Sequence, residues 1–307
     1  MRLCTLKIAQ WSTRSVTYKT IRRTSSVATT PKNISILPDD SLETFRSHAF
    51  KPELPALLPR GSFSGMPAIT KWFSRSSKDS SNARLNVEYL SKYGDVVLPI
   101  EVTDGQGFSQ LHQPLQFFLD ASESLNQSSE TRMYLAQASI SDLPPSMSSD
   151  IPTPPLVLSA GKGDLYASSI WLGHAPTYTP LHRDPNPNLF VQLCGTKRMR
   201  LFRPEVGAAV FHYVQGVVGG SATATMRGVE MMEGREREVL EMVVWEDGAS
   251  GEDGGGGGGG GGAAPWSEHC FECEVGSGDG LFIPKGWWHS VKGVGRGMNG
   301  SVNWWFR

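Results

Sequence analysis

The chain has 307 residues, 39% of them hydrophobic, and a formal net charge of −1 at pH 7. This length allows a sizeable buried core, and the near-neutral charge gives no electrostatic footprint for nucleic acid, which is not expected as a partner. Four cysteines are too few for a disulfide framework, which favours a reducing compartment, and no apolar run approaches the roughly 20 residues that span a bilayer, so no membrane partner is expected.

The first 38 residues are basic and contain no acid before Asp39. Their positive charges are Arg2, Lys7, Arg14, Lys19, Arg22, Arg23 and Lys32. With many serines and threonines, this composition is typical of a mitochondrial transit peptide, and residues 22–26 would suit a processing site. The alternatives are a disordered basic tail or a misassigned start codon, which would leave the protein cytoplasmic or nuclear. We expect a mitochondrial location.

Residues 39–130 are predicted to form a helical lead-in that packs on the domain after it. A helix-like stretch at 41–46 gives way to prolines at 52, 55 and 59, which forbid a long helix. Apolar spacing then predicts a short element leading into a helix at 66–73, a helix at 85–93 that Gly94 ends, and a helix at 111–124. One strand is expected in this region, at 96–102.

The second half of the chain is predicted to be rich in strands. Aromatic and β-branched residues between glycine and proline turns indicate strands at 132–140, 165–172, 188–194, 198–202, 270–275, 280–283, 288–291 and 301–306. Many short strands of this kind are typical of an antiparallel barrel or jelly roll. We predict a mainly β, α+β fold: a double-stranded β-helix of the jelly-roll or cupin type over 131–307, with N-terminal helices packed outside it.

An insertion at about 205–265 interrupts this strand-rich region. It ends in nine consecutive glycines, Gly254 to Gly262, which cannot bury apolar surface to offset their ordering entropy. The insertion is therefore predicted to be a flexible loop. The acidic stretch that holds Glu233, Glu236, Glu238 and Glu241 is either a helix or simply a solvated face.

The most informative residues are His182, Asp184 and the distant His289. A His-x-Asp pair with a remote histidine supplies two imidazoles and a carboxylate, the ligand set that holds Fe(II) on one face and leaves positions for a cosubstrate and dioxygen. A His-x-Asp triplet alone also arises by coincidence in solvated loops. The context favours iron, because prolines flank both segments and a glycine and two tryptophans precede His289.

Strand parity predicts which side chains share a face with these ligands. Side chains two residues apart point the same way, so Trp287 and Val291 should accompany His289, with Trp288 and Ser290 on the opposite face. In the last strand the shared face should hold Ser301, Asn303 and Trp305, and the other Val302, Trp304 and Phe306. Because a buried amide must find partners, the iron or its cosubstrate is a candidate partner for Asn303.

Two further features each have two interpretations. Lys197 either enters the barrel, where it would bind the far carboxylate of a dicarboxylate and need a counter-ion, or is an ordinary exposed lysine; Arg198 and Arg200 would take the outer face. Cys270 and Cys273, beside His269, have the spacing of half a zinc site. No second pair follows them, which favours two thiols on a strand.

Residues 165–204 and 270–307 together resemble the JmjC family of cupin-fold, Fe(II)- and 2-oxoglutarate-dependent oxygenases, in its small, hydroxylase-like branch. The matching blocks are Thr-Pro-Leu-His-Arg-Asp at 179–184, Asn-Leu-Phe-Val-Gln at 188–192, Gly-Thr-Lys-Arg at 195–198, Phe-Arg-Pro at 202–204, the run at 278–289 and Val-Asn-Trp-Trp at 302–305. Weaker similarity extends back to about residue 40. The chain departs from the family pattern in the insertion at 205–265.

The resemblance implies a role for each matching position. His182, Asp184 and His289 would bind iron. Lys197 and Thr179 would bind the distal carboxylate of 2-oxoglutarate. The remaining implied cosubstrate residues are Tyr134, which would assist them, and Asn188, Phe190, Asn303 and Trp305, which would line the pocket.

The resemblance also implies an activity. It would use Fe(II), 2-oxoglutarate and dioxygen, yield succinate and carbon dioxide, and most readily hydroxylate a protein side chain. Three alternatives stay open: a lysine demethylase, a tRNA hydroxylase of the same family, and a non-catalytic metal-binding cupin scaffold. The expected partner is a protein substrate, and the resemblance allows a homodimer.

Overall fold

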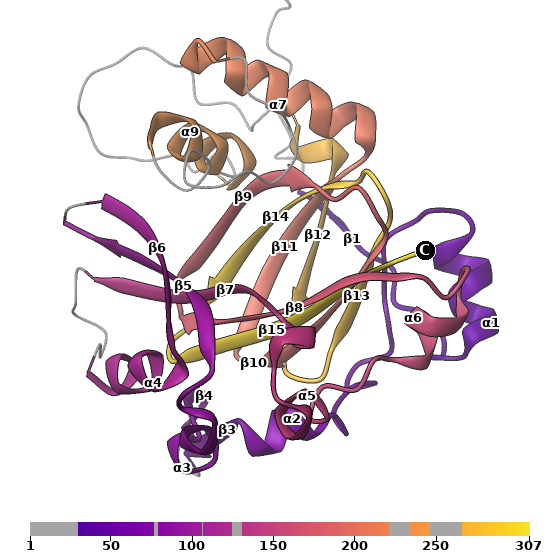
Figure 1. The fold of residues 1–307 in the computed structure, drawn as a ribbon. Coiled ribbons are helices and arrows are strands. Elements are labelled where there is room, and N and C mark those ends of the chain that lie inside the picture. The colour runs from indigo at the N-terminus through magenta and orange to yellow at the C-terminus, as the bar shows by residue number, and fades with distance from the viewer. Residues whose placement is uncertain (1–29, 77–78, 106, 125–130, 221–233, 246–265) are drawn as a thin grey trace, which may run out of the picture.

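The computed structural model describes residues 30–76, 79–105, 107–124, 131–220, 234–245 and 266–307. Two mainly antiparallel sheets face each other (Figure 1). The five-stranded sheet has the order β1 (Lys32–Asn33), β12 (Cys270–Val275), β11 (Thr196–Phe202), β14 (Trp288–Val294), β9 (Thr177–Arg183). The eight-stranded sheet has the order β2 (Ala56–Leu57), β13 (Gly280–Ile283), β10 (Asn188–Cys194), β15 (Met298–Phe306), β8 (Leu165–His174), β7 (Arg132–Ser139), β5 (Val97–Asp104), β6 (Gly107–Pro114).

The strand order confirms the predicted jelly roll. β10 lies between β13 and β15, and β11 lies between β12 and β14, so early and late strands interleave in both sheets. A separate hairpin consists of β3 (Phe73–Ser76) and β4 (Asp79–Leu85). Among the described helices, none is long and apolar enough to cross a membrane.

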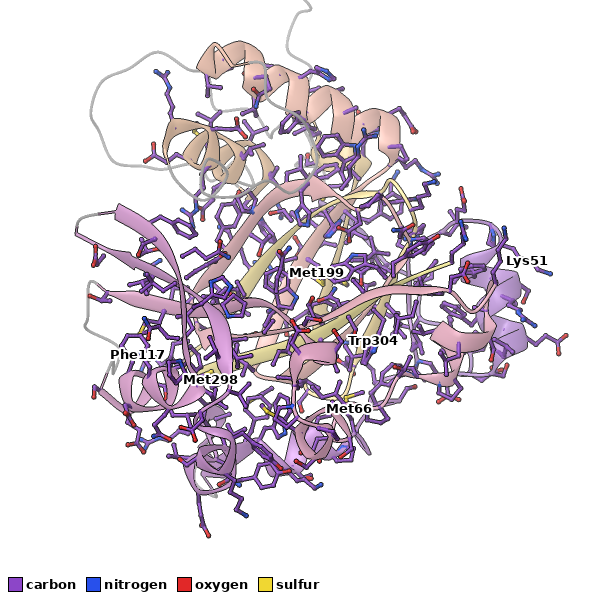
Figure 2. All side chains as sticks on the ribbon, in the orientation of Figure 1. Lys51, Met66, Phe117, Met199, Met298 and Trp304 are labelled. Carbon is purple, nitrogen blue, oxygen red and sulfur yellow. The ribbon has the colours of Figure 1, made fainter. Side chains whose placement is uncertain are left out.

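The space between the sheets holds an apolar cluster that contains Met199, which Figure 2 labels, together with Phe190 and Trp287. Met199 and Leu201 come from β11, on the same face as Lys197, which is 3% exposed. The interior of the barrel is thus apolar around a few buried polar residues. Such residues need partners when they are buried, so they mark the position of a site.

Short helices cover the outer face of the eight-stranded sheet. They are α1 (Leu42–Phe45), the π-helical η1 (Arg46–Phe50), α2 (Pro67–Lys71), α3 (Val87–Leu90), η2 (Ser91–Tyr93), α4 (Leu115–Ser124), η3 (Ile140–Asp142), α5 (Pro145–Ser148) and α6 (Pro155–Ser159). Their buried side chains form one cluster with Val302, Trp304 and Phe306 of β15. This is the face that strand parity assigned to those three residues, and helices from the region between residues 42 and 159 pack on it.

Two helices cover the outer face of the five-stranded sheet (Figure 1). They are α7 (Pro204–Val218) and α9 (Gly234–Trp245), and a short turn, η4 (Ser267–His269), leads into β12. The expected flexible loop over 205–265 is therefore helical in these parts. One face of α7 carries Val210, Phe211 and Val214, which pack in one apolar cluster with Trp288. This packing explains why residues 204–218 form a helix and not a loop. Glu233 and the nine glycines lie outside the described residues.

Three predicted boundaries are corrected. Residues 30–38 belong to the folded body and not to a tail: β1 pairs with β12, and Ile34 and Leu37 are each 5% exposed. Leu85 ends β4, so the helix predicted at 85–93 begins at Val87, after Asn86, whose side chain accepts from Tyr89 N. Residues 107–114 pair with β5, which leaves Leu111 38% exposed on a strand and starts α4 at Leu115. Residues 1–29 lie outside the described residues, so targeting stays a prediction.

Candidate metal centre

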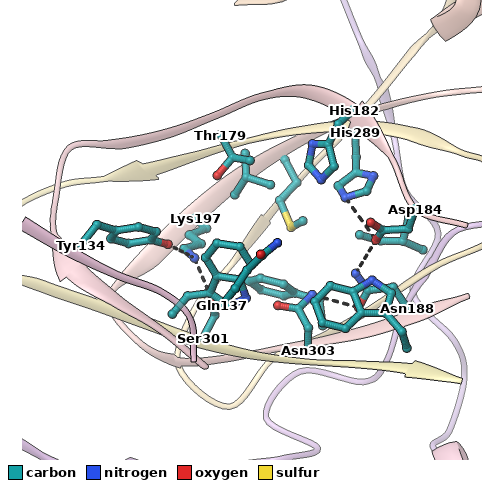
Figure 3. Close-up of a pocket in the computed structure, with 16 residues that line it drawn as sticks. Tyr134, Gln137, Thr179, His182, Asp184, Asn188, Lys197, His289, Ser301 and Asn303 are labelled. Carbon is teal, nitrogen blue, oxygen red and sulfur yellow. Dashed lines mark hydrogen bonds and ion pairs between the residues drawn. The ribbon is translucent and has the colours of Figure 1, made fainter. Parts of the chain in front are cut away.

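The structure brings His182, Asp184 and His289 together (Figure 3). His182 lies near the end of β9, directly opposite His289 on the neighbouring strand β14, and their rings are 4.2 Å apart between centroids. Asp184 follows β9 at once, and its backbone oxygen accepts a hydrogen bond from the Gly286 N–H just before β14. One ligand atom from each of the three residues lies within 4.8 Å of the others, and all three are buried.

Backbone carbonyls fix the orientation of both imidazoles. His182 Nδ1 lies 2.8 Å from Pro180 O, and His289 Nδ1 lies 3.3 Å from Trp287 O. Because a carbonyl oxygen only accepts, each Nδ1 must donate, which leaves the lone pair of each Nε2 for a metal. Burial, reinforced by His289, lowers the pKa of His182 to about 4, so this imidazole is neutral at physiological pH.

Asp184 is held by a chain of buried amides. Asn188 Nδ2 donates to Asp184 Oδ2 at 2.9 Å, and Asn303 Nδ2 donates to Asn188 Oδ1 at 2.9 Å. Burial acts to raise the pKa of Asp184, but the two histidines and hydrogen bonds from Trp305 and Asn188 outweigh it and lower the pKa. The carboxylate is therefore ionised and oriented. Asn303 thus has an amide partner in Asn188.

The same pocket contains every residue expected to contact 2-oxoglutarate. Asn188 and Asn303 lie toward Asp184, Tyr134 and Lys197 lie at the opposite end, and Thr179 lies between Lys197 and the two histidines (Figure 3). Sequence reasoning did not assign Gln137, Trp171 or Ser301 to this pocket, although the parity of β15 places Ser301 beside Asn303. Gln137 lies at a register shift in β7 with φ +52°, a local backbone irregularity that no sequence pattern signals.

Lys197 is a buried cation whose neighbours are neutral. Its Nζ donates to Ser301 Oγ at 2.7 Å and to Tyr134 OH at 3.4 Å, and it lies 5.3 Å from the centre of the Phe190 ring. Among the described residues, no carboxylate forms an ion pair with it. Desolvation lowers the pKa of Lys197 to about 7. An anionic ligand at this end of the pocket would provide the expected counter-ion.

Among the described side chains, the cations on the outer face of β11 form ion pairs, unlike Lys197 on its inner face. Arg198 and Arg200 both donate to Glu272, over 2.6 and 2.5 Å, as the parity of β11 predicts. Cys270 and Cys273 are both buried on β12 and enter different apolar clusters. In the described parts of the chain, the His182–Asp184–His289 group alone has metal-site geometry, so the two cysteines are thiols on a strand.

Comparison with known proteins gives consistent matches. A model of the cupin-like domain matches residues 42–307. Lysine-specific demethylase JMJ30 of Arabidopsis thaliana is 26% identical over 270 residues, which cover 87% of this chain and 53% of that protein. Lysine-specific demethylase 8 of Xenopus tropicalis is 23% identical over 277 residues, which cover 87% and 51%. Jumonji C domain-containing protein 5 of Drosophila melanogaster is 28% identical over 180 residues, which cover 56% and 42%. The chain spans about half the length of the first two relatives.

Proposed function

The chain belongs to the cupin-like family of JmjC-type domains, and on that premise we propose that it is an Fe(II)- and 2-oxoglutarate-dependent dioxygenase that hydroxylates a protein side chain. JmjC enzymes use Fe(II), 2-oxoglutarate and dioxygen. The observation that carries the proposal is the placement of the His–Asp–His group and the Lys197 cation at the two ends of one buried pocket. A molecule with two carboxylates fits between such ends.

The residues present fit this ion and this cosubstrate. Two imidazoles and one ionised carboxylate form the donor set of Fe(II) oxygenases, and each donor is oriented by a hydrogen bond. When bound, iron and 2-oxoglutarate supply oxidative decarboxylation to succinate and carbon dioxide together with oxidation of a substrate C–H bond.

The chain's own residues bind and orient the reactants. We assign Lys197 and Thr179, with help from Tyr134, to the distal carboxylate of 2-oxoglutarate. Asn188 and Asn303 hold Asp184, and Phe190 and Trp305 line the pocket. The buried position of these groups excludes bulk water from the space between them, which strengthens their electrostatic interactions.

Succinate formation tests the activity. Purified protein with Fe(II), ascorbate and 2-oxoglutarate should form succinate, and His182→Ala should reduce turnover to background. His269→Ala is the matched control, because its side chain is 52% exposed and lies outside the triad. Background turnover in the wild type as well as in His182→Ala would favour the non-catalytic scaffold.

Demethylation is the second candidate, because two of the relatives above are named lysine-specific demethylases. The two reactions differ in where oxygen is inserted: hydroxylation of an N-methyl carbon releases formaldehyde, and hydroxylation elsewhere leaves oxygen on the side chain. Proteins trapped by an inactive variant, then incubated with the active enzyme and analysed by mass spectrometry, separate them. A gain of roughly 16 mass units, one oxygen atom, supports hydroxylation. Formaldehyde release with loss of a methyl group supports demethylation.

We also propose mitochondrial import, on the composition of the basic N-terminus. A fusion of residues 1–40 to a fluorescent reporter should enter mitochondria. A diffuse cytosolic signal would remove this proposal and leave the enzymatic one untouched.

A further inference from the structure

A second cavity, of about 370 Å³, adjoins the catalytic pocket, and Tyr134 lines both. It lies where α9 comes beside the edge strand β9, across from the hairpin of β5 and β6 (Figure 1). The eight-stranded sheet contributes Glu101, Arg132 and His174, and α9 contributes Arg237. The cavity is therefore built partly from the insertion that departs from the JmjC pattern.

Two polar atoms in the walls of this cavity lack partners. Arg237 Nε and His174 Nε2 are both buried, and neither has a hydrogen-bond partner among the residues that the structure describes. The guanidinium of Arg237 is also held in place, because its Cζ lies 4.8 Å from the centre of the Tyr178 ring. Buried polar groups are normally paired, and Nε itself has almost no accessible surface, so a ligand in the cavity would meet the rest of the Arg237 guanidinium.

The charges in the cavity favour an anion as this acceptor. Two guanidinium groups, Arg132 and Arg237, oppose a single carboxyl group, Glu101. Burial raises the pKa of Glu101 to about 7, so its negative charge is only partial at physiological pH. A guanidinium binds a carboxylate through charge-assisted hydrogen bonds, which are stronger than bonds to neutral acceptors.

We propose that this cavity is a substrate subsite that binds an acidic side chain of the polypeptide substrate, with Arg237 as its main anchor. The proposal rests on the proposed function, because the occupant is the substrate of that enzyme; the shared wall at Tyr134 places the cavity beside the Lys197 end of the catalytic pocket. The distal carboxylate of 2-oxoglutarate is assigned to Lys197 in the other pocket, so it does not compete for Arg237. Arg237 would thus favour substrates that carry an acidic side chain.

The test compares two probes of the same shape and different charge. N-acetyl-glutamate N-methylamide and N-acetyl-glutamine N-methylamide are titrated by calorimetry into full-length protein loaded with Zn(II) and 2-oxoglutarate. The wild type should bind the glutamate probe about tenfold more tightly, the contribution of one charge-assisted hydrogen bond. Arg237→Gln should abolish this preference. Arg235→Gln, on the same helix, exposed and outside the cavity, should retain it.

Two outcomes of this titration decide the proposal directly. Equal affinity of the wild type for both probes would overturn it, and so would a preference that survives in folded Arg237→Gln. If Arg237→Gln does not fold, Arg237→Lys decides: it keeps the charge but not the planar fork, so a reduced preference supports the subsite and an unchanged one overturns it. Probe binding requires no turnover, so an inactive wild type that still prefers glutamate would count against the proposed activity alone.

Discussion

Asn188 donates a hydrogen bond through Nδ2 to Oδ2 of Asp184, over 2.9 Å, while its own Oδ1 accepts from Asn303. The same carboxylate oxygen lies 3.7 Å from Nε2 of His289, so the amide holds the oxygen that faces this imidazole. Because both partners are at most 8% exposed, water cannot replace this bond without rearrangement. The amide therefore sets the direction from which Asp184 can bind a metal.

Removal of this amide should weaken metal binding. Asn188→Ala should reduce the affinity for Mn(II), a stand-in for Fe(II), by about ten- to a hundredfold, as expected for the loss of a group that orients a ligand. Asn303→Ala leaves the hydrogen bond from Asn188 to Asp184 intact and should reduce the affinity for Mn(II) by less. Calorimetry measures both, with Asn86→Ala, a remote helix cap, as the control. Wild-type affinity in Asn188→Ala would show that Asp184 needs no support.

Loss of Lys197 should affect the cosubstrate and not the metal. Lys197→Ala should raise the concentration of 2-oxoglutarate needed for half-maximal turnover by about tenfold or more, because a buried charge-assisted contact is lost. The affinity for Mn(II) should stay close to that of the wild type. Lys292→Ala is the matched control, since Lys292 pairs with Glu241 on the outside of the barrel. A variant with unchanged cosubstrate dependence would remove this role from Lys197.

Binding of 2-oxoglutarate should depend on pH through the same lysine. The pKa of Lys197 is lowered to about 7 by burial, and a bound carboxylate would raise it again. Affinity should therefore be highest below pH 7 and fall as pH rises above it, and binding at about pH 8 should take up protons. Calorimetry in buffers of different ionisation enthalpy measures that uptake. Constant affinity from about pH 6 to about pH 9 would contradict the assignment.

The docking of α7 should depend on one glycine. A Cβ at Gly207 would lie 2.2 Å from Cγ of Trp288, whereas a Cβ at Gly216 on the same helix meets nothing within 4 Å. Gly207→Ala should lower the free energy of unfolding by about 1–3 kcal/mol through overpacking. Gly216→Ala should leave it unchanged or raise it by about 0.5–1 kcal/mol. Urea unfolding compares the two, and equal stabilities would show that α7 packs more loosely than described.

Much of the barrel could be predicted because alternation and turn residues are local signals. The strands expected at 188–194, 270–275 and 280–283 match β10, β12 and β13, and parity placed His289 and Trp288 on opposite faces. The strand that carries His182 was not predicted. Pro180 interrupts its pattern, and β9 is an edge strand whose pairing with β14 is a long-range contact that local sequence does not show.

The unpredicted parts of the site come from contacts between distant segments. The two neutral partners of Lys197, Tyr134 and Ser301, lie 63 and 104 residues away in sequence. The residues that line the second cavity lie even farther apart in sequence, since they include Glu101 and Arg237. Arg237 belongs to the insertion, whose glycines suggested only a flexible loop. Residue type predicted the three side chains that meet in the candidate metal centre. It could not predict which groups tertiary packing would leave without partners.

The most direct test of the metal centre is a crystal structure of the protein grown with Mn(II) and 2-oxoglutarate under anaerobic conditions. Anomalous diffraction should place one ion within roughly 2.3 Å of Nε2 of His182, Nε2 of His289 and one carboxylate oxygen of Asp184. An ion bound elsewhere, or three correctly folded side chains with no ion among them at saturating metal, would contradict the account.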